Sequence, residues 1–98
     1  MRIGTTLCKK KESAFQEEVL QYLRTNVGGY WIKIHVSSYQ SEGEPDIVGC
    51  YNGRFYAFEL KTIVGKPSKL QEYKLGQIRG AGGTALVVND LQQIKDLF

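Results

Sequence analysis

The stretch from residue 43 to residue 62, GEPDIVGCYNGRFYAFELKT, contains the strongest fold signal in the chain. At its centre stands Asn52-Gly53, a dipeptide typical of a tight β-hairpin turn. Residues 46–51 before the turn and residues 54–62 after it are rich in β-branched and aromatic side chains, which favour strands. The sequence therefore predicts an antiparallel hairpin over these residues.

Three charged side chains interrupt this largely apolar hairpin. With the turn at Asn52-Gly53, Asp46 lies directly opposite Glu59 on the partner strand. Glu59 and Lys61 are two residues apart, so both point to the same face. Opposed carboxylates repel each other unless a positive charge lies between them, and a divalent cation supplies one. The alternative is an ion pair of Lys61 with one carboxylate on an exposed face, which leaves the other carboxylate unexplained.

Hydrophobic periodicity and turn residues define the elements on both sides of the hairpin. Upstream, we expect a helix over residues 10–26, ended by Gly28 and Gly29, then a strand over 30–36 and a polar loop over 37–44. Downstream, Pro67 is expected in the first turn of a helix over 66–79. A buried strand over residues 84–88 follows, and then a short helix to residue 98, capped by Asn89 or Asp90.

The predicted order is therefore α-β-β-β-α-β-α, an α/β fold with a central, mixed four-stranded sheet flanked by helices. The crossover through the second long helix adds the last strand in parallel. A length of 98 residues indicates a single domain over residues 1–98, with residues 1–9 as a loose, basic N-terminus.

Charge is unevenly distributed along the chain, whose net charge is +3. Residues 1–11 hold four basic and no acidic residues, residues 12–60 hold three basic and seven acidic, and residues 61–80 hold five basic and one acidic. This alternation fits a polyanion-binding surface around a metal-binding cleft, although an ordinary solvated surface also produces such a pattern.

The remaining composition argues against several other classes of protein. No apolar run has the roughly 20 residues that span a bilayer, and no secretory signal is visible, so we expect a cytoplasmic protein without membrane contact. Cys8 and Cys50 lie far apart, which favours neither a disulfide nor a zinc site. The single histidine, His35, is expected on a half-buried strand rather than in a catalytic triad.

Pro45-Asp46, followed after 12 residues by Glu59-Leu60-Lys61, resembles the PD-(D/E)XK nuclease signature. The chain resembles more closely the VRR-NUC family of small nucleases, found in phages and in larger repair proteins. The matching stretches are residues 12–23, 43–62, 66–71 (KPSKLQ) and 81–88 (AGGTALVV), nearly the whole chain. In outline it is also similar to archaeal Holliday junction resolvases. The resemblance implies a restriction-endonuclease-like core and metal-dependent hydrolysis of DNA.

The resemblance also implies a third carboxylate from the first helix. At about 100° per residue, Glu12 falls within the apolar stripe that contains Phe15 and Val19, whereas Glu17 points nearly opposite and Glu18 lies at the stripe's edge. Glu12 is therefore preferred, and Glu17 is the alternative. A glutamate in the first helical turn also has a simpler explanation, since it interacts favourably with the helix dipole.

The site that the resemblance implies contains Mg²⁺ or Mn²⁺. Its protein ligands are Asp46, Glu59, Glu12 and the backbone carbonyl of Leu60. Lys61 positions the nucleophile or offsets developing charge.

Gln71 is the last residue of the family's Ser-x-x-Gln helix start, and the resemblance assigns it to ordering water or phosphate near Lys61. Judged from the residues alone, Ser68 and Gln71 form a helix capping box, and the two roles are compatible.

DNA is the expected partner. Lys66 and Lys69, just beyond the site, are expected to hold flanking phosphates, as are residues of the preceding loop, namely Ser37, Ser38 and Gln40. The viral members that the chain resembles suggest a phage homodimer, acting in the host cytoplasm on Holliday junctions or other branched DNA. Tyr30-Trp31 and Phe55-Tyr56 supply either the dimer surface or core packing.

Three other functions remain open from the sequence. One is a nuclease of the same fold without junction preference, and another is a non-catalytic DNA-binding module. The third is a protein–protein module whose charged hairpin face forms salt bridges, which predicts neither metal binding nor salt-dependent DNA affinity.

Overall fold

The computed structural model describes residues 12–35, 42–62 and 65–98, so the basic N-terminus over residues 1–9 lies outside the described residues. The described chain follows the predicted order α-β-β-β-α-β-α. The helices are α2 (Glu12–Tyr22), continued by the π-helical turn η1 (Leu23–Val27), then α3 (Lys69–Gly80) and α4 (Leu91–Leu97). The strands are β1 (Tyr30–Lys33), β2 (Ile47–Tyr51), β3 (Arg54–Leu60) and β4 (Thr84–Val88).

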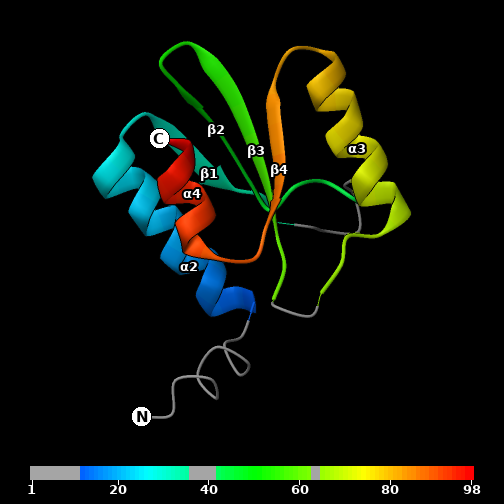
Figure 1. The fold of residues 1–98 in the computed structure, drawn as a ribbon, viewed down its shortest axis with the longest axis horizontal. Helices are drawn as coiled ribbons and strands as arrows, with labels where there is room; N and C mark the ends of the chain where they lie inside the picture. Colours follow the sequence, from blue (N-terminus) through cyan, green and yellow to red (C-terminus); the bar gives the residue numbers. More distant parts are fainter. Residues whose placement is uncertain (1–11, 36–41, 63–64) are drawn as a thin grey trace.

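The four strands form one mixed sheet in the order β1-β2-β3-β4. β1 pairs with β2 and β2 with β3 in antiparallel fashion, whereas β4 is parallel to β3, as the crossover through α3 requires. Helices α2 and α4 lie against one face and α3 lies against the other (Figure 1). The fold is therefore the predicted α/β arrangement of a mixed sheet between helices.

The hairpin of β2 and β3 has the predicted turn and register. Asn52 and Gly53 both have positive φ, 54° and 80°, the conformation that this dipeptide favours in a two-residue turn. Ile47 is paired with Phe58. One position further on, the backbone N–H of Asp46 donates to the carbonyl of Phe58 at 3.0 Å. Regular pairing therefore ends at Ile47, and Asp46 lies just beyond it, at the same end of the hairpin as Glu59.

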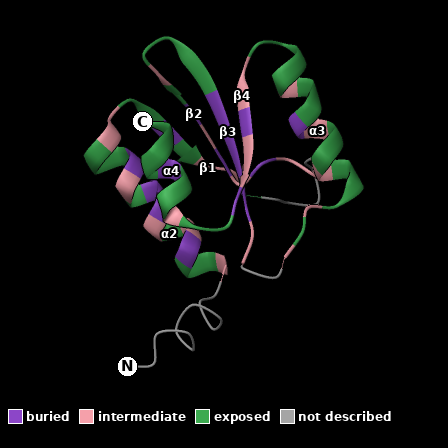
Figure 2. Ribbon diagram, viewed as in Figure 1, coloured by how far each residue is buried: buried purple, intermediate pink, exposed green. Residues whose placement is uncertain are grey.

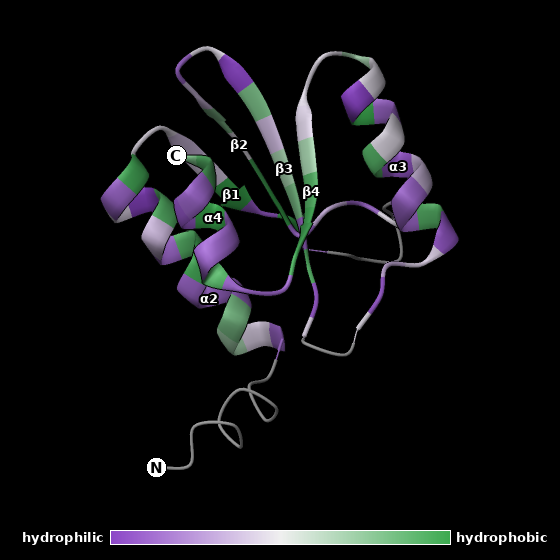
Figure 3. Cartoon of the chain, viewed as in Figure 1, coloured by the Kyte–Doolittle hydropathy of each residue, from purple (hydrophilic) through white to green (hydrophobic). Residues whose placement is uncertain are grey.

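Two apolar clusters hold the layers together (Figures 2 and 3). The larger one joins α2 and α4 to the sheet, and Trp31 stacks on Phe58 within it with ring centroids 5.9 Å apart. The smaller one lies under α3 and consists of Leu75 packed on Ala57 and Ala85. Small alanine side chains bring α3 close to β3 and β4. No helix among the described residues has the length and apolarity to cross a bilayer.

Three predicted strands are shorter in the structure, the second by only one residue, since β2 begins at Ile47 and not at residue 46. The first was expected over residues 30–36 but ends at Lys33, and the third was expected to reach residue 62 but ends at Leu60. His35 consequently lies beyond β1 and is exposed, not half-buried on a strand. Regular pairing with β2 ends at Lys33, the partner of Ile47, and only the N–H of Ile34, which donates to Asp46, continues the contact among the described residues.

The second long helix begins later than predicted. It starts at Lys69 rather than residue 66, so Pro67 precedes the helix instead of lying in its first turn. Ser68 is the N-cap because its side chain accepts the backbone N–H of Gln71. β4 matches its predicted bounds, but it is an edge strand on which only Ala85 and Val88 are buried. Asp90, one of the two predicted caps, caps α4.

Candidate active site

Three carboxylates from separate elements converge at one end of the sheet. Asp46 immediately precedes β2, Glu59 is the penultimate residue of β3, and Glu12 is the first residue of α2. One carboxylate oxygen of each lies within 4.8 Å of the others. Of the two predicted helix glutamates, the structure brings Glu12 into this cluster. Glu17 instead pairs with Lys33 at 3.4 Å, and its side chain is 68% exposed.

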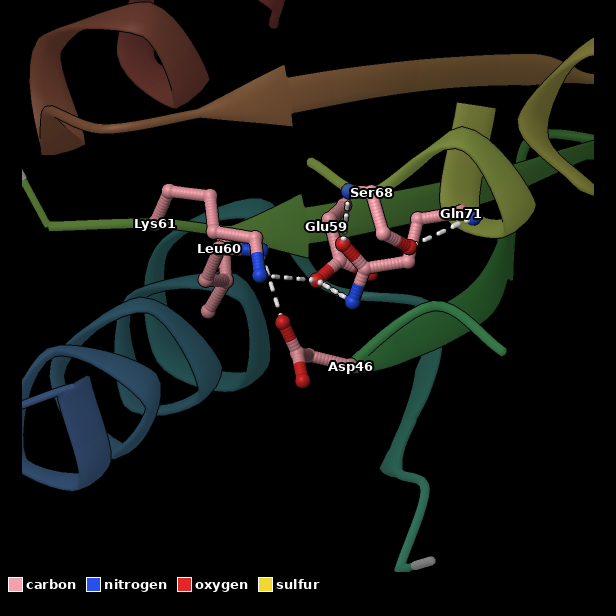
Figure 4. Close-up of polar contacts among 6 residues, drawn as sticks. All are labelled: Asp46, Glu59, Leu60, Lys61, Ser68 and Gln71. Carbon is pink, nitrogen blue, oxygen red and sulfur yellow. Dashed lines mark hydrogen bonds and ion pairs between the residues drawn. The ribbon is translucent and has the colours of Figure 1, made fainter. Parts of the chain in front are cut away.

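Backbone hydrogen bonds on both sides fix the position of Asp46. Its N–H donates to Phe58 of β3, and its carbonyl accepts the N–H of Ile34 at 2.8 Å. Its carboxylate Oδ2 accepts the backbone N–H of Leu60 at 2.7 Å (Figure 4). The side chain is therefore oriented by the strand that carries Glu59.

Glu59 is a fully buried carboxylate with an uneven set of partners. Only 1% of the residue is exposed. Its Oε2 accepts a hydrogen bond from Nε2 of Gln71 at 2.8 Å and lies 3.3 Å from Nζ of Lys61 (Figure 4). Its Oε1 is buried and has no hydrogen-bond partner among the described residues. Because an unpartnered buried charge is costly, this oxygen marks a position that a cation would stabilise.

The pKa shifts of Glu59 and Asp46 also indicate a position that a cation would stabilise. Burial, and after it the neighbouring charge of Asp46, raise the pKa of Glu59 to about 7, against the opposing effect of Lys61. Burial also raises the pKa of Asp46, against the opposing effects of the Leu60 N–H and Lys61. Two neighbouring carboxylates whose ionised forms are both disfavoured by burial form a site at which a divalent cation reverses the balance.

Lys61 and Gln71 complete the polar surroundings. The backbone N–H of Lys61 donates to Val88 at 2.9 Å, so pairing with β4 continues one residue past β3 and holds Lys61 beside Glu59. The ion pair expected as the alternative to metal binding is thus present, but with a buried rather than an exposed carboxylate. Gln71 closes the predicted capping box with Ser68 and also contacts Glu59.

The other predicted site residues are two lysines, Leu60 and three loop residues. Lys66 and Lys69 are exposed around the start of α3. For Leu60, the contact with the site is the N–H donated to Asp46, and the predicted metal contact of its carbonyl stays a prediction. The three predicted loop residues, Ser37, Ser38 and Gln40, lie outside the described residues.

One contact next to the site was not predicted. Nζ of Lys74 lies 2.9 Å from a carboxylate oxygen of Glu44, which ties α3 to the segment that leads into Asp46. The two residues are 30 positions apart, and neither belongs to a local pattern. Pairing of this kind depends on how α3 packs, so no signal in the sequence points to it.

Comparisons with known proteins bear on the fold of the chain. No protein-family model matches the chain, and no curated protein does. Among solved structures, the chain is similar to one described as "VRR_NUC domain", with 21% sequence identity and a TM-score of 0.70. The alignment covers 90% of this chain and 95% of that chain. The chain therefore has the fold of a VRR_NUC domain, as the resemblance in sequence led us to expect.

Proposed function

We propose that this protein is a metal-dependent nuclease that hydrolyses phosphodiester bonds in DNA. The observation that carries the proposal is the convergence of Glu12, Asp46 and Glu59, in which a buried oxygen of Glu59 has no partner among the described residues. The shared fold with a VRR_NUC domain, whose name denotes a nuclease, supports the same assignment. A purely DNA-binding protein has no use for clustered carboxylates facing phosphate.

Mg²⁺ or Mn²⁺ fits the residues at this position. The set offers only hard oxygen donors, which these ions prefer, and it contains neither cysteine nor histidine. Glu12, Asp46 and Glu59 are the proposed ligands, with the carbonyl of Leu60 as a further one. A bound ion of this kind polarises a phosphoryl oxygen and lowers the pKa of bound water.

Basic side chains near the cluster provide the complementary charge. Lys61, held beside Glu59, is proposed to position the attacking water or to offset charge that develops on the phosphate. Lys66 and Lys69, exposed around the start of α3, are proposed to bind flanking phosphates. The same role is proposed for the loop residues Ser37, Ser38 and Gln40.

We further propose that the protein acts as a homodimer on branched DNA such as a four-way junction. Tyr30 is 67% exposed and Phe55 45% exposed, and both are paired with Cys50, so they lie on one face across three strands. On this face α3 packs on β3 and β4. Trp31 and Tyr56 belong instead to the core. An uncharged, apolar strip suits a second copy, and paired cuts in a junction need two active sites.

The decisive experiment compares cleavage of a labelled four-way junction with that of a matched linear duplex, in Mg²⁺, Mn²⁺ or EDTA. We expect metal-dependent, symmetrical cuts in the junction. The Asp46→Ala and Glu12→Gln variants should lose activity, whereas Glu17→Gln, a change on the same helix outside the cluster, should retain it. Cutting of both substrates supports a nuclease without junction preference. DNA binding without metal-dependent cutting refutes the enzyme and leaves a binding module.

Sedimentation velocity tests the dimer. We expect the Phe55→Ser variant to be monomeric. The matched control is Tyr73→Ser, because Tyr73 is 62% exposed on α3 and lies outside the strip. A wild-type protein that sediments as a monomer at all accessible concentrations contradicts the dimer but not the nuclease.

A further inference from the structure

The side chain of Gln71 links the start of α3 to the carboxylate cluster. Its Oε1 accepts the backbone N–H of Ser68 at 2.8 Å, and its Nε2 donates to Oε2 of Glu59 at 2.8 Å. We propose that Gln71 is a positioning residue, which holds Oε2 of Glu59 on the protein side and thereby presents Oε1 to the cation. The inference rests on the proposed function, because it concerns the same metal site.

The capping box determines which way this amide points. The Ser68 N–H is a donor and needs the amide oxygen, so the NH₂ group is left to face Glu59. A flipped amide would place its NH₂ against the Ser68 N–H and its oxygen against a carboxylate. The backbone N–H of Gln71 also donates to Oγ of Ser68, at 3.1 Å, which fixes the residue at both ends. The donor that reaches Glu59 is therefore preorganised before any ion binds.

Gln71 provides a fixed hydrogen-bond donor to Glu59, which Lys61 does not. Both donors meet the same oxygen of Glu59, but Lys61 has a long, flexible side chain and is proposed to act on phosphate or water. Gln71 belongs to a helix that is anchored by buried Leu75 and by the Lys74–Glu44 ion pair. It therefore keeps Glu59 oriented when Lys61 turns towards substrate.

The chain contains a matched control for this role. α4 begins with the same kind of capping box, in which Oε1 of Gln93 accepts the backbone N–H of Asp90 at 3.0 Å and that of Asn89 at 2.7 Å. Gln93 is not a hydrogen-bond partner of Glu59 within the described residues. Gln71→Met and Gln93→Met each remove one cap, but only the former removes a donor from the carboxylate cluster.

The test is Mn²⁺ affinity, measured by electron paramagnetic resonance of the free ion, together with thermal melting of the metal-free variants. Residues that orient metal ligands typically contribute about 10-fold or more to affinity, so we expect Gln71→Met to bind Mn²⁺ at least about tenfold more weakly than wild type. Gln93→Met should bind within about twofold of wild type while losing similar thermal stability.

A second variant separates the cap from the contact on α3 itself. Ser68→Ala removes the acceptor of the Gln71 N–H but leaves the amide beside Glu59, so its Mn²⁺ affinity should stay close to that of wild type. Equal Mn²⁺ affinities of Gln71→Met and Gln93→Met would overturn the inference. Failure of wild type to bind Mn²⁺ more tightly than Asp46→Ala would instead overturn the proposed function.

Discussion

We expect the Glu59→Gln variant to be more stable than wild type in metal-free buffer at about pH 8, although it should be inactive. Glu59 is buried, and without a cation its ionised form is opposed both by burial and by the charge of Asp46. Glutamine has nearly the same shape but carries no charge. The substitution therefore removes the electrostatic cost of the site and leaves the packing almost unchanged.

The magnitude follows from the pKa of Glu59, which rises from 4.5 to about 7 on folding. Because the folded protein holds this proton more tightly, the stabilisation is fully present below about pH 4.5 and is lost as the pH rises through about 7. One pKa unit corresponds to about 1.4 kcal/mol, so wild type should lose about 3 kcal/mol over this range. The pKa of Asp46 is raised in the same direction. Lys61, which loses a charged partner in the variant, makes the net gain somewhat smaller.

The assay is urea denaturation in EDTA across this pH range, with the free energy of unfolding determined at each pH. Glu17→Gln is the matched control, because it removes a glutamate from an exposed ion pair and should keep the wild-type pH dependence. A Glu59→Gln variant that is less stable than wild type at about pH 8, or that loses stability with pH as steeply, would refute the reasoning.

Further predictions concern metal binding, the packing of the sheet and the ion pair between Lys74 and Glu44. Mn²⁺ at about 100 times its dissociation constant should stabilise wild type by about 2.7 kcal/mol in thermal melts, and Asp46→Ala should abolish the effect. Gly49→Ala should cost about 1–3 kcal/mol in urea denaturation, because the added Cβ meets the backbone oxygen of Tyr30 and the Trp31 ring. Lys74→Ala removes a partly exposed ion pair with Glu44, so the same measurement should show a loss of less than about 1 kcal/mol.

Much of the fold was predictable because its signals are local. Asn52-Gly53 adopts the positive φ angles that set the hairpin register, and this register brings Asp46 and Glu59 to the same end of the hairpin. Strand ends were less predictable, because a strand lasts only as long as its partner does. β1 ends at Lys33, where its regular pairing with β2 ends, and the start of β2 cannot be read from residues 30–36. Both Pro67 and Ser68 are residues typical of a helix start, and the capping hydrogen bonds of Ser68 determine that α3 begins after it.

The candidate site, too, was predictable from the sequence only in part. Strand alternation places Glu59 and Lys61 together, and helical periodicity selects Glu12 over Glu17, a choice that the carboxylate distances support. The contact of Gln71 with Glu59 was beyond the sequence, because it depends on where α3 packs across β3. A capping motif explains a glutamine at this position, but it does not reveal what the free end of the amide reaches.

The location of the cluster follows from the alternation of β3. Phe58 and Leu60 point into the large apolar cluster beneath α2 and α4, so Glu59 must point to the opposite face. On that face the cluster of buried residues under α3 is small, and the starts of α2, β2 and α3 each bring a polar side chain to the same end of the sheet. Backbone hydrogen bonds hold Asp46, and the helix cap of α3 holds Gln71. The buried carboxylate with a free oxygen costs stability while no cation is bound, but its fixed surroundings are what a cation needs.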